Sequence, residues 1–281
     1  MTMINGLSVN EIISRALIED IGTGDITTVS TVSKEQVITG KFIAKEAGII
    51  CGLEIVKSVF EMIDKNVTLS FYVKDGIPVE FGDVIAEIKG PAISILTGER
   101  VALNFIQRLS GIATKTSSLV EMVQGTKSKI TDTRKTTPGL RILEKYAVKV
   151  GGGSNHRFNL SDGVLLKDNH IVAAGGITKA IVAARKNIPH TLKIEIEVEN
   201  LEQISEALNA GADIIMLDNM ELQMLKKAVQ MIDGRALVEA SGNMGDKDIL
   251  SVAETGVDFI SVGALTHTIR SLDISLKFKE V

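Results

Sequence analysis

A repeating pattern of short apolar runs in the second half of the chain is the feature that most constrains its fold. After Gly125, runs rich in Ile, Val and Leu alternate with segments of helical periodicity. From the third run onward they recur roughly every 20 residues, which is the spacing of βα units. Because helices separate them, the strands should lie parallel, and a closed or nearly closed α/β barrel is expected. The expected strands are residues 129–133, 164–168, 193–198, 213–218, 236–241 and 258–263.

The first 90 residues have a different pattern, in which strands outnumber helices. Ser8 and Glu11 have capping-box spacing and precede apolar residues at helical intervals, so a helix is expected over residues 8–19. Glycine and polar residues over 20–28 predict a loop. The remaining pattern predicts an α+β module with strands at 37–45, 67–73 and 84–88 and a helix at 52–64.

A long apolar segment follows this module. Pro91 can begin a helix, because its missing N–H is not needed in the first turn. Apolar residues recur at helical spacing from Ala92 to Met122, and Gly111 marks a point where the helix could break. A helix of this length is a natural bridge between two domains.

Cations gather in residues 131–170, although the formal net charge of the whole chain is −4. Arginine offers a planar fork of donors to carboxylates and phosphates, and lysine offers a compact charge. This segment is therefore expected to hold an anionic ligand, through Arg134, Lys135, Arg157 and Lys167. Three further cations are expected on the solvated face of a helix: Arg141, Lys145 and Lys149.

The ends of the expected strands place the candidate site. In α/β barrels the active site lies at the carboxyl ends of the strands, so six separate strands should direct their terminal residues to one mouth. The first two bring cations, the next two carboxylates, and the last two small residues and glycine. In chain order these residues are Thr133, Arg134, Lys135, Lys167, Asp168, Glu197, Asp218, Asn219, Ser241, Gly242, Asn243 and Gly263.

The carboxylates Glu197 and Asp218 fit as acceptors for ribose hydroxyls or as outer ligands of a Mg²⁺ carried in by phosphates. A structural salt bridge is the alternative. Glu195 and Glu199 share the strand parity of Glu197, so periodicity does not decide which of the three points inward.

Glycine-containing loops after the last two strands are expected to bind phosphate. Such loops expose backbone N–H groups at the start of a helix, and barrels commonly use them in this way. The segments are Ser241–Asn243 and Val262–Ala264. For His267, which follows the second loop, a capping or core role is the alternative to ligand binding.

Composition excludes several classes of protein. A pI of 5.7, no Trp and two Tyr argue against binding nucleic acid. Cys51 is the only cysteine, so no intramolecular disulfide is expected. No continuous apolar run reaches the length of a membrane span, and no membrane association is expected. These features together predict a cytoplasmic protein.

Seven ordered motifs resemble those of the quinolinate phosphoribosyltransferases, also called nicotinate-nucleotide pyrophosphorylases (carboxylating). They are TRKTTPGLR (133–141), GGGSNHR (151–157), LLKDNHI (165–171), EVEN (197–200), DIIMLDN (213–219), EASGN (239–243) and TGVDFISVGALTH (255–267). The resemblance implies an N-terminal α/β sandwich domain, residues 1–104 joined by 268–281, and an incomplete α/β barrel catalytic domain, residues 105–267. It also implies that a late strand at 272–278 returns to the first domain.

The resemblance also implies a role for each matching residue. The quinolinate carboxylates would be bound by Thr133, Arg134, His156, Arg157 and Lys167. The ribose and phosphates of phosphoribosyl pyrophosphate would be bound by Lys135, Glu197, Asp218, Ser241, Gly242, Asn243, Val262, Gly263, Ala264 and His267. Lys135, Lys167, Glu197 and Asp218 would be catalytic. Arg100 would complete the site of the neighbouring subunit in a homodimer or larger assembly.

The implied reaction joins quinolinate to phosphoribosyl pyrophosphate and yields nicotinate mononucleotide, pyrophosphate and CO₂, a step of NAD biosynthesis. Mg²⁺ would arrive with the phosphates, with no dedicated protein metal site and no organic cofactor. Three alternatives stay open: a Schiff-base aldolase using Lys167, a non-catalytic nucleotide or phosphate sensor, and a transferase acting on nicotinate or another heterocycle.

Overall fold

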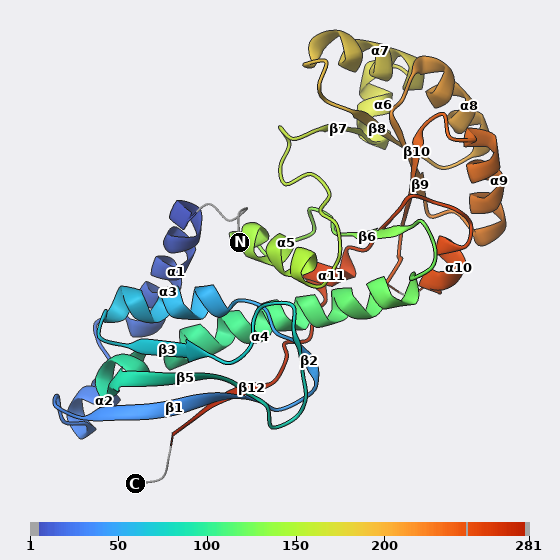
Figure 1. The fold of residues 1–281 in the computed structure, drawn as a ribbon. Helices are drawn as coiled ribbons and strands as arrows, with labels where there is room; N and C mark the ends of the chain where they lie inside the picture. The colour runs from blue at the N-terminus through green and yellow to red at the C-terminus, as the bar shows by residue number, and fades with distance from the viewer. Residues whose placement is uncertain (1–5, 246, 279–281) are drawn as a thin grey trace. The chain divides into compact units, whose positions relative to one another are not determined.

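The structure is a computed structural model that describes residues 6–245 and 247–278. The chain divides into two compact units. The first comprises Met1–Ser117, Thr137–Gly152 and Ile269–Val281, and the second comprises Ser118–Thr136 and Gly153–Thr268. Each unit has its own main sheet (Figure 1).

The first unit contains a four-stranded antiparallel sheet in the order β12-β1-β5-β3. Its strands are β1 (Val37–Ala44), β3 (Thr68–Phe71), β5 (Val84–Pro91) and β12 (Ile274–Phe278), and a two-stranded sheet pairs β2 (Gly48–Ile49) with β4 (Pro78–Val79). β12 lies against β1, with Gly40 opposite Phe278 and Ala44 opposite Ile274. The last described residues thus complete a sheet begun more than 200 residues earlier.

Two predictions near the N-terminus were wrong. Helix α1 is Gly6–Ile21, so Ser8 lies inside the helix and does not cap it. Part of the expected loop 20–28 belongs to a second helix, α2 (Ile26–Thr31). The signal for α2 is Asp25, whose carboxylate accepts a hydrogen bond from the Thr28 N–H as an N-cap should.

Helix α3 (Leu53–Ile63) agrees with expectation, and helix α4 (Ala92–Met122) runs unbroken through Gly111. A Cβ at Gly111 would lie 2.2 Å from the carbonyl oxygen of Arg270, so glycine is there for close backbone approach. Pro91 ends β5 and does not begin the helix.

Helix α5 (Arg141–Val150) corrects the expectation for one of its cations, Lys145, whereas Lys149 is exposed as expected. Lys145 is fully buried, as is its neighbour Glu144, which pairs with Arg108 of α4 at 2.5 Å. The end of α5 also lies against α4: a Cβ at Gly151, just past the end of α5, would lie 2.4 Å from the Ala113 carbonyl oxygen. Sequence spacing does not reveal such close contact with α4.

The second unit is an open α/β barrel. Its six strands are all parallel in the order β6-β11-β10-β9-β8-β7, and β6 and β7 form no ladder with each other among the described residues. Each strand lies within its expected run: β6 (Lys129–Thr131), β7 (Val164–Leu166), β8 (Ile194–Val198), β9 (Ile214–Asp218), β10 (Leu237–Ser241) and β11 (Phe259–Ser261).

Helices α7, α8 and α9 form an outer arc over this sheet (Figure 1). The helices of the unit are α6 (Asp168–Ala174), α7 (Ile177–Asn187), α8 (Leu201–Ala210), α9 (Leu222–Ile232), α10 (Ile249–Ala253) and α11 (Ala264–His267). Ile196, Ile215 and Leu217 are fully buried, as expected of parallel strands that are covered on both faces. The expected incomplete barrel is confirmed.

Candidate active site

The carboxyl ends of the six parallel strands lie at one edge of the second unit. This edge carries every predicted site residue except Arg100, which is exposed on α4 in the first unit. Parallel strands bring their ends together even when the residues are far apart in sequence. Hydrogen bonds and close contacts join neighbouring loops around the edge.

The ends of β7 and β8 are joined by an ion pair. Lys167 Nζ lies 2.6 Å from Glu197 Oε2, with the lysine side chain 47% exposed. Pairs this exposed contribute roughly 0 to 1 kcal/mol, so an anionic ligand can compete for the lysine at little cost. The predicted alternative of a salt bridge is therefore present without excluding ligand binding.

The ends of β9 and β10 form a strained pair of turns. Asn219 and Asn243 adopt left-handed backbone conformations, with φ of 53° and 51°. Asn219 donates from its backbone N–H to the Ser241 carbonyl oxygen at 3.1 Å and from Nδ2 to Asp218 Oδ2 at 2.7 Å. Strain of this kind is concentrated at ligand-binding sites, and here it fixes Asp218 beside the Ser241–Asn243 loop.

The β11 end contacts the loop that follows β6. A Cβ at Gly263 would lie 3.1 Å from Lys135 Cδ and 3.2 Å from His267 Nε2. The Thr266 hydroxyl donates to the Lys135 carbonyl oxygen at 2.8 Å. The structure thus brings together Lys135, the Val262–Ala264 loop and His267.

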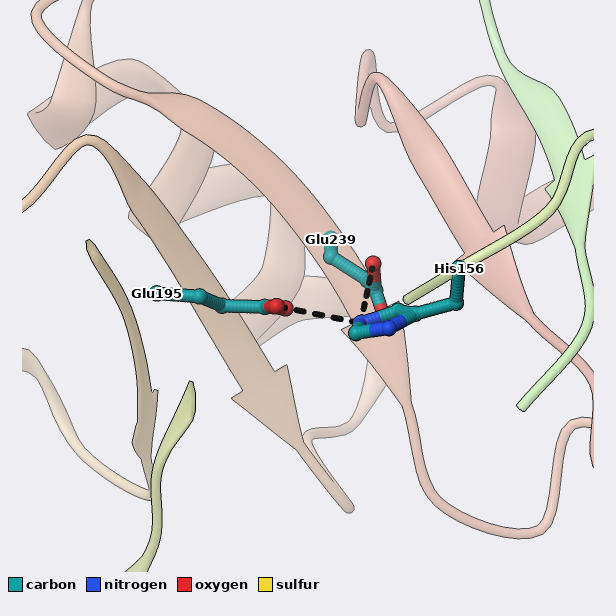
Figure 2. Close-up of side chains that lie close together, drawn as sticks. All are labelled: His156, Glu195 and Glu239. Carbon is teal, nitrogen blue, oxygen red and sulfur yellow. Dashed lines mark ion pairs between the residues drawn. The ribbon is translucent and has the colours of Figure 1, made fainter. Parts of the chain in front are cut away.

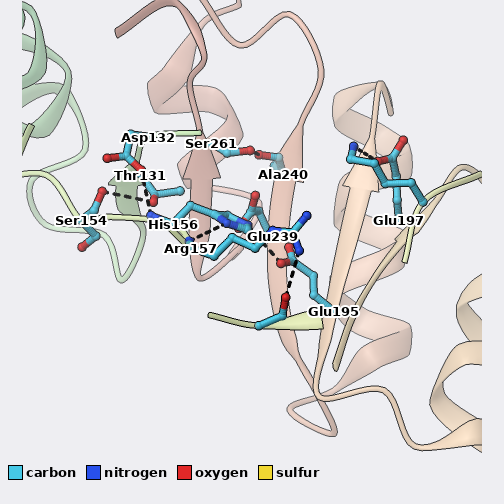
Figure 3. A network of polar contacts seen from close by, with 12 residues as sticks. Thr131, Asp132, Ser154, His156, Arg157, Glu195, Glu197, Glu239, Ala240 and Ser261 are labelled. Atoms are coloured by element: carbon cyan, nitrogen blue, oxygen red, sulfur yellow. Dashed lines mark hydrogen bonds and ion pairs between the residues drawn. The ribbon is translucent and has the colours of Figure 1, made fainter. Parts of the chain in front are cut away.

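Asp132, buried at the end of β6, organises the loop that carries His156 and Arg157. Its Oδ1 accepts from the His156 N–H at 2.8 Å, and Figure 3 shows the two residues. Its Oδ2 accepts from Asn155 Nδ2 at 2.6 Å. Burial, together with the positive charge of Arg134, lowers the pKa of Arg157. Thr133 accepts from the Lys135 N–H at 3.0 Å. The two arginines thus place positive charge near each other.

His156 has protein partners on both ring nitrogens. Nδ1 accepts from the Arg157 N–H at 2.8 Å, while Nε2 lies 3.0 Å from Glu195 Oε2 and 3.8 Å from Glu239 Oε2 (Figure 2). The imidazole is thus held edge-on between the loop and the barrel interior.

Sequence reasoning missed Glu239 and left open whether Glu195 points inward. Both are buried, at 5% and 4% exposure, on β8 and β10. For Glu239 the available signal was a charged residue inside a run that is otherwise apolar, which is rare unless the charge is paired. Burial, with the negative charge of Glu195, raises the pKa of Glu239 to about 7. One atom from each of Glu195, Glu239 and His156 lies within 4.8 Å of the others, a spacing that a metal ion could also bridge.

The second unit is an open α/β barrel whose strand ends carry cations, carboxylates and glycine-containing loops. This arrangement defines a class of protein: a barrel enzyme for phosphorylated substrates that carry several negative charges.

Among the described residues, no helix is both long and apolar enough to cross a membrane.

Comparison with known proteins identifies the family. Residues 25–110 match the model for the N-terminal domain of quinolinate phosphoribosyl transferase, and residues 112–277 match the model for its C-terminal domain. A probable nicotinate-nucleotide pyrophosphorylase (carboxylating) of Bacillus subtilis is 46% identical over 97% of this chain and 94% of its own length. The structure of the nicotinate-nucleotide pyrophosphorylase from Francisella tularensis is 43% identical, with a TM-score of 0.94 over 98% of each chain. The chain belongs to the quinolinate phosphoribosyltransferase family, as its motifs predicted.

Proposed function

We propose that this chain transfers the phosphoribosyl group of phosphoribosyl pyrophosphate to quinolinate with decarboxylation, the reaction named for its relatives. The products are nicotinate mononucleotide, pyrophosphate and CO₂, and the reaction belongs to de novo NAD synthesis. The observation that carries the proposal is the gathering of two kinds of group at one barrel edge. Cations follow β6 and β7, and are called the cationic flank, while carboxylates and glycine loops follow β8 to β11 and are called the other flank.

The cationic flank suits a pyridine dicarboxylate. A ligand with two carboxylates needs more than one cation away from the phosphate loops, and arginine forks match carboxylate geometry. The residues assigned to quinolinate are Thr133, Arg134, His156, Arg157 and Lys167. In the free enzyme Lys167 is held by Glu197, so substrate binding would exchange one carboxylate partner for another.

The other flank suits the phosphoribosyl donor. Glu197 and Asp218 face the sugar as acceptors for its hydroxyls, and their negative charge stabilises the oxocarbenium-like transition state that forms as pyrophosphate leaves. The loops at Ser241–Asn243 and Val262–Ala264 offer backbone N–H groups to phosphate, and Lys135 and His267 lie next to the second loop.

The pyridine nitrogen attacks the anomeric carbon and becomes positively charged. That charge stabilises the carbanion left at C2 when CO₂ departs, so the chain has mainly to orient the two substrates and to supply the surrounding charges. Mg²⁺ prefers oxygen ligands, and the half-buried carboxylate of Asp218 could hold it beside the phosphates. When bound, the ion would offset negative charge on the leaving pyrophosphate.

We further propose a homodimer in which Arg100 reaches the partner's site, and a cytoplasmic location. The exposure of Arg100 on α4 makes it accessible to a second copy. The single cysteine, Cys51, is buried and forms no disulfide, which suits a reducing compartment. Equal mixing of an Arg100→Ala variant with a variant inactivated in the barrel should restore about a quarter of the sites if the arginine acts across the dimer.

The deciding experiment mixes purified protein with quinolinate, phosphoribosyl pyrophosphate and Mg²⁺ and measures CO₂ and mononucleotide. Nicotinate is the control acceptor, and a chelator tests the metal requirement. Turnover of nicotinate in place of quinolinate would overturn the substrate assignment. The aldolase alternative is disfavoured because a Schiff-base lysine needs desolvated surroundings, whereas Lys167 is 47% exposed and ion-paired.

A further inference from the structure

Two carboxylates lie inside the barrel with a single imidazole between them. Glu195 on β8 and Glu239 on β10 are each more than nine-tenths buried, and both approach the same atom, His156 Nε2 (Figure 2). Two charged carboxylates this deep in a barrel would repel each other and lack the hydration that stabilises them in water. Some positive charge or a proton must compensate.

A single imidazole cannot neutralise both carboxylates. Its Nδ1 accepts from the Arg157 N–H at 2.8 Å, and its Nε2 lies 3.0 Å from Glu195 Oε2 and 3.8 Å from Glu239 Oε2. Even a positively charged imidazole would supply one charge to two buried carboxylates, so it leaves one of them uncompensated.

The groups around Glu239 compensate its charge only in part, because burial and the negative charge of Glu195 outweigh the favourable effects of His156, Ser261 and Lys167. Those that act on it are Glu195 from β8, His156 from the preceding loop, Ser261 from β11 and Lys167 from the end of β7. Lys167 is already paired with Glu197 at 2.6 Å. Oε1 of Glu239 and Oε1 of Glu195 are buried and have no hydrogen-bond partner among the described residues. A charged acceptor that is buried without a partner costs more than a neutral one, so this environment favours a proton on one of the two carboxyl groups.

We propose that Glu239 is a positioning residue that holds a proton when quinolinate binds and, through His156 and Glu195, sets the charge of the dicarboxylate-binding flank. The inference rests on the proposed function and extends it to a residue outside the predicted site. When Glu239 is neutral, the cations of this flank are balanced by Glu195 alone and remain attractive to a dianion. When Glu239 loses its proton, a second buried negative charge opposes the incoming carboxylates.

The raised pKa of Glu239, about 7, places this change in the neutral range. Quinolinate binding should therefore be tight below pH 7 and weaken as pH rises above it, by up to roughly tenfold per pH unit if only the protonated form binds. Phosphoribosyl pyrophosphate, which is assigned to the other flank, should not follow this dependence on Glu239.

The first test uses the unmodified enzyme. Calorimetry of quinolinate binding at pH 8, in buffers of different ionisation enthalpy, should show uptake of about one proton, falling toward none at pH 6. Quinolinate's own carboxyl groups titrate at lower pH and do not contribute. Binding without proton uptake at pH 8 would overturn the proposal.

The second test compares variants. Glu239→Gln should keep the wild-type quinolinate KM at pH 6 and lose its rise toward pH 8.5, while Glu239→Asp, which can still titrate, should keep a rise. Glu202→Gln, at an exposed position on α8, should behave as wild type. The proposal would be refuted if the quinolinate KM of Glu239→Gln depended on pH as in the wild type. It would also be refuted if the KM for phosphoribosyl pyrophosphate changed equally.

Two further outcomes are separable. Stoichiometric binding of Zn²⁺ by the wild type that Glu239→Gln abolishes would assign the cluster to a metal and overturn the proton role. Absence of quinolinate turnover by the wild type at every pH would refute the proposed function itself, and with it this inference. Turnover by the wild type, with a pH dependence of the quinolinate KM that Glu239→Gln leaves unchanged, would refute this inference but not the proposed function.

Discussion

Asn219 and Gly242 approach so closely that a Cβ added to Gly242 would lie 2.2 Å from Asn219 Oδ1. The two residues follow neighbouring strands, β9 and β10, and both have positive φ, 53° and 92°. Their contact joins the carboxylate Asp218 to the loop that is proposed to bind phosphate. The part of the site that is proposed to bind phosphoribosyl pyrophosphate therefore depends on a glycine at position 242, because a side chain there would collide with Asn219.

We predict that Gly242→Ala lowers kcat/KM for phosphoribosyl pyrophosphate by at least about tenfold, because the new methyl group must push Asn219 and Asp218 out of position. The matched control is Gly211→Ala, whose φ of 85° is equally left-handed but which has nothing within 4 Å of a new Cβ. That control should lose about 1 kcal/mol of stability from backbone strain and keep its activity. Steady-state kinetics and urea unfolding of both variants check this, and equal activity losses would contradict it.

Arg134→Ala should weaken quinolinate binding by roughly 10- to 100-fold, since a charge-assisted contact typically contributes about 1.5 to 3 kcal/mol. Affinity for phosphoribosyl pyrophosphate should change much less. Titration calorimetry with each substrate separates the two effects, and Arg235→Ala, which removes an exposed arginine bonded to the Met231 carbonyl oxygen, is the control. An equal loss for both substrates would refute the assignment of Arg134 to the dicarboxylate.

Glu144→Ala is expected to destabilise the first unit by about 3 to 5 kcal/mol, because it leaves Arg108 without the buried carboxylate that both its Nε and its Nη2 contact. The same carboxylate also accepts the Thr137 N–H at 3.0 Å. Chemical denaturation at pH 7 measures the loss, with Glu61→Ala as control because its pair with Lys57, at 3.8 Å, is exposed. A loss below about 1 kcal/mol for Glu144→Ala would show that the pair is not structurally important.

The barrel, and the edge that carries the candidate site, could be predicted from sequence. The alternation of strands and helices is visible in local periodicity and needs no knowledge of distant contacts. Lys167, Glu197 and Asp218 follow apolar runs directly, and parallel strands bring such ends together whatever their separation. Lys145 and Glu239 could not be predicted in the same way. Whether a charged residue is buried depends on which elements cover it, and this is decided by packing between segments that local periodicity does not describe.

The N-terminal errors have a local cause. Ser8 and Glu11 have the spacing of a capping box, yet the helix begins upstream of them, because the motif only favours a start and does not prevent earlier residues from joining. Asp25 was the better signal, since its side chain caps α2 through Thr28. A helix of six residues offers too little periodicity to be recognised without its cap.

Glu239 should also leave a signature in stability. Its folded-state pKa of about 7 lies above the ordinary glutamate value of 4.5, so folding favours the protonated form. The stabilising contribution is complete below about pH 4.5 and is lost as pH rises through 7, because the unfolded chain then releases a proton that the folded chain retains. At 1.36 kcal/mol per pKa unit, the full change is on the order of 3 kcal/mol. Glu239→Gln carries no ionisable group there, so its stability relative to wild type should increase between pH 5 and pH 8 by about that amount. Urea unfolding of both proteins across this range measures the difference, and a constant difference would mean that Glu239 does not titrate in the folded barrel.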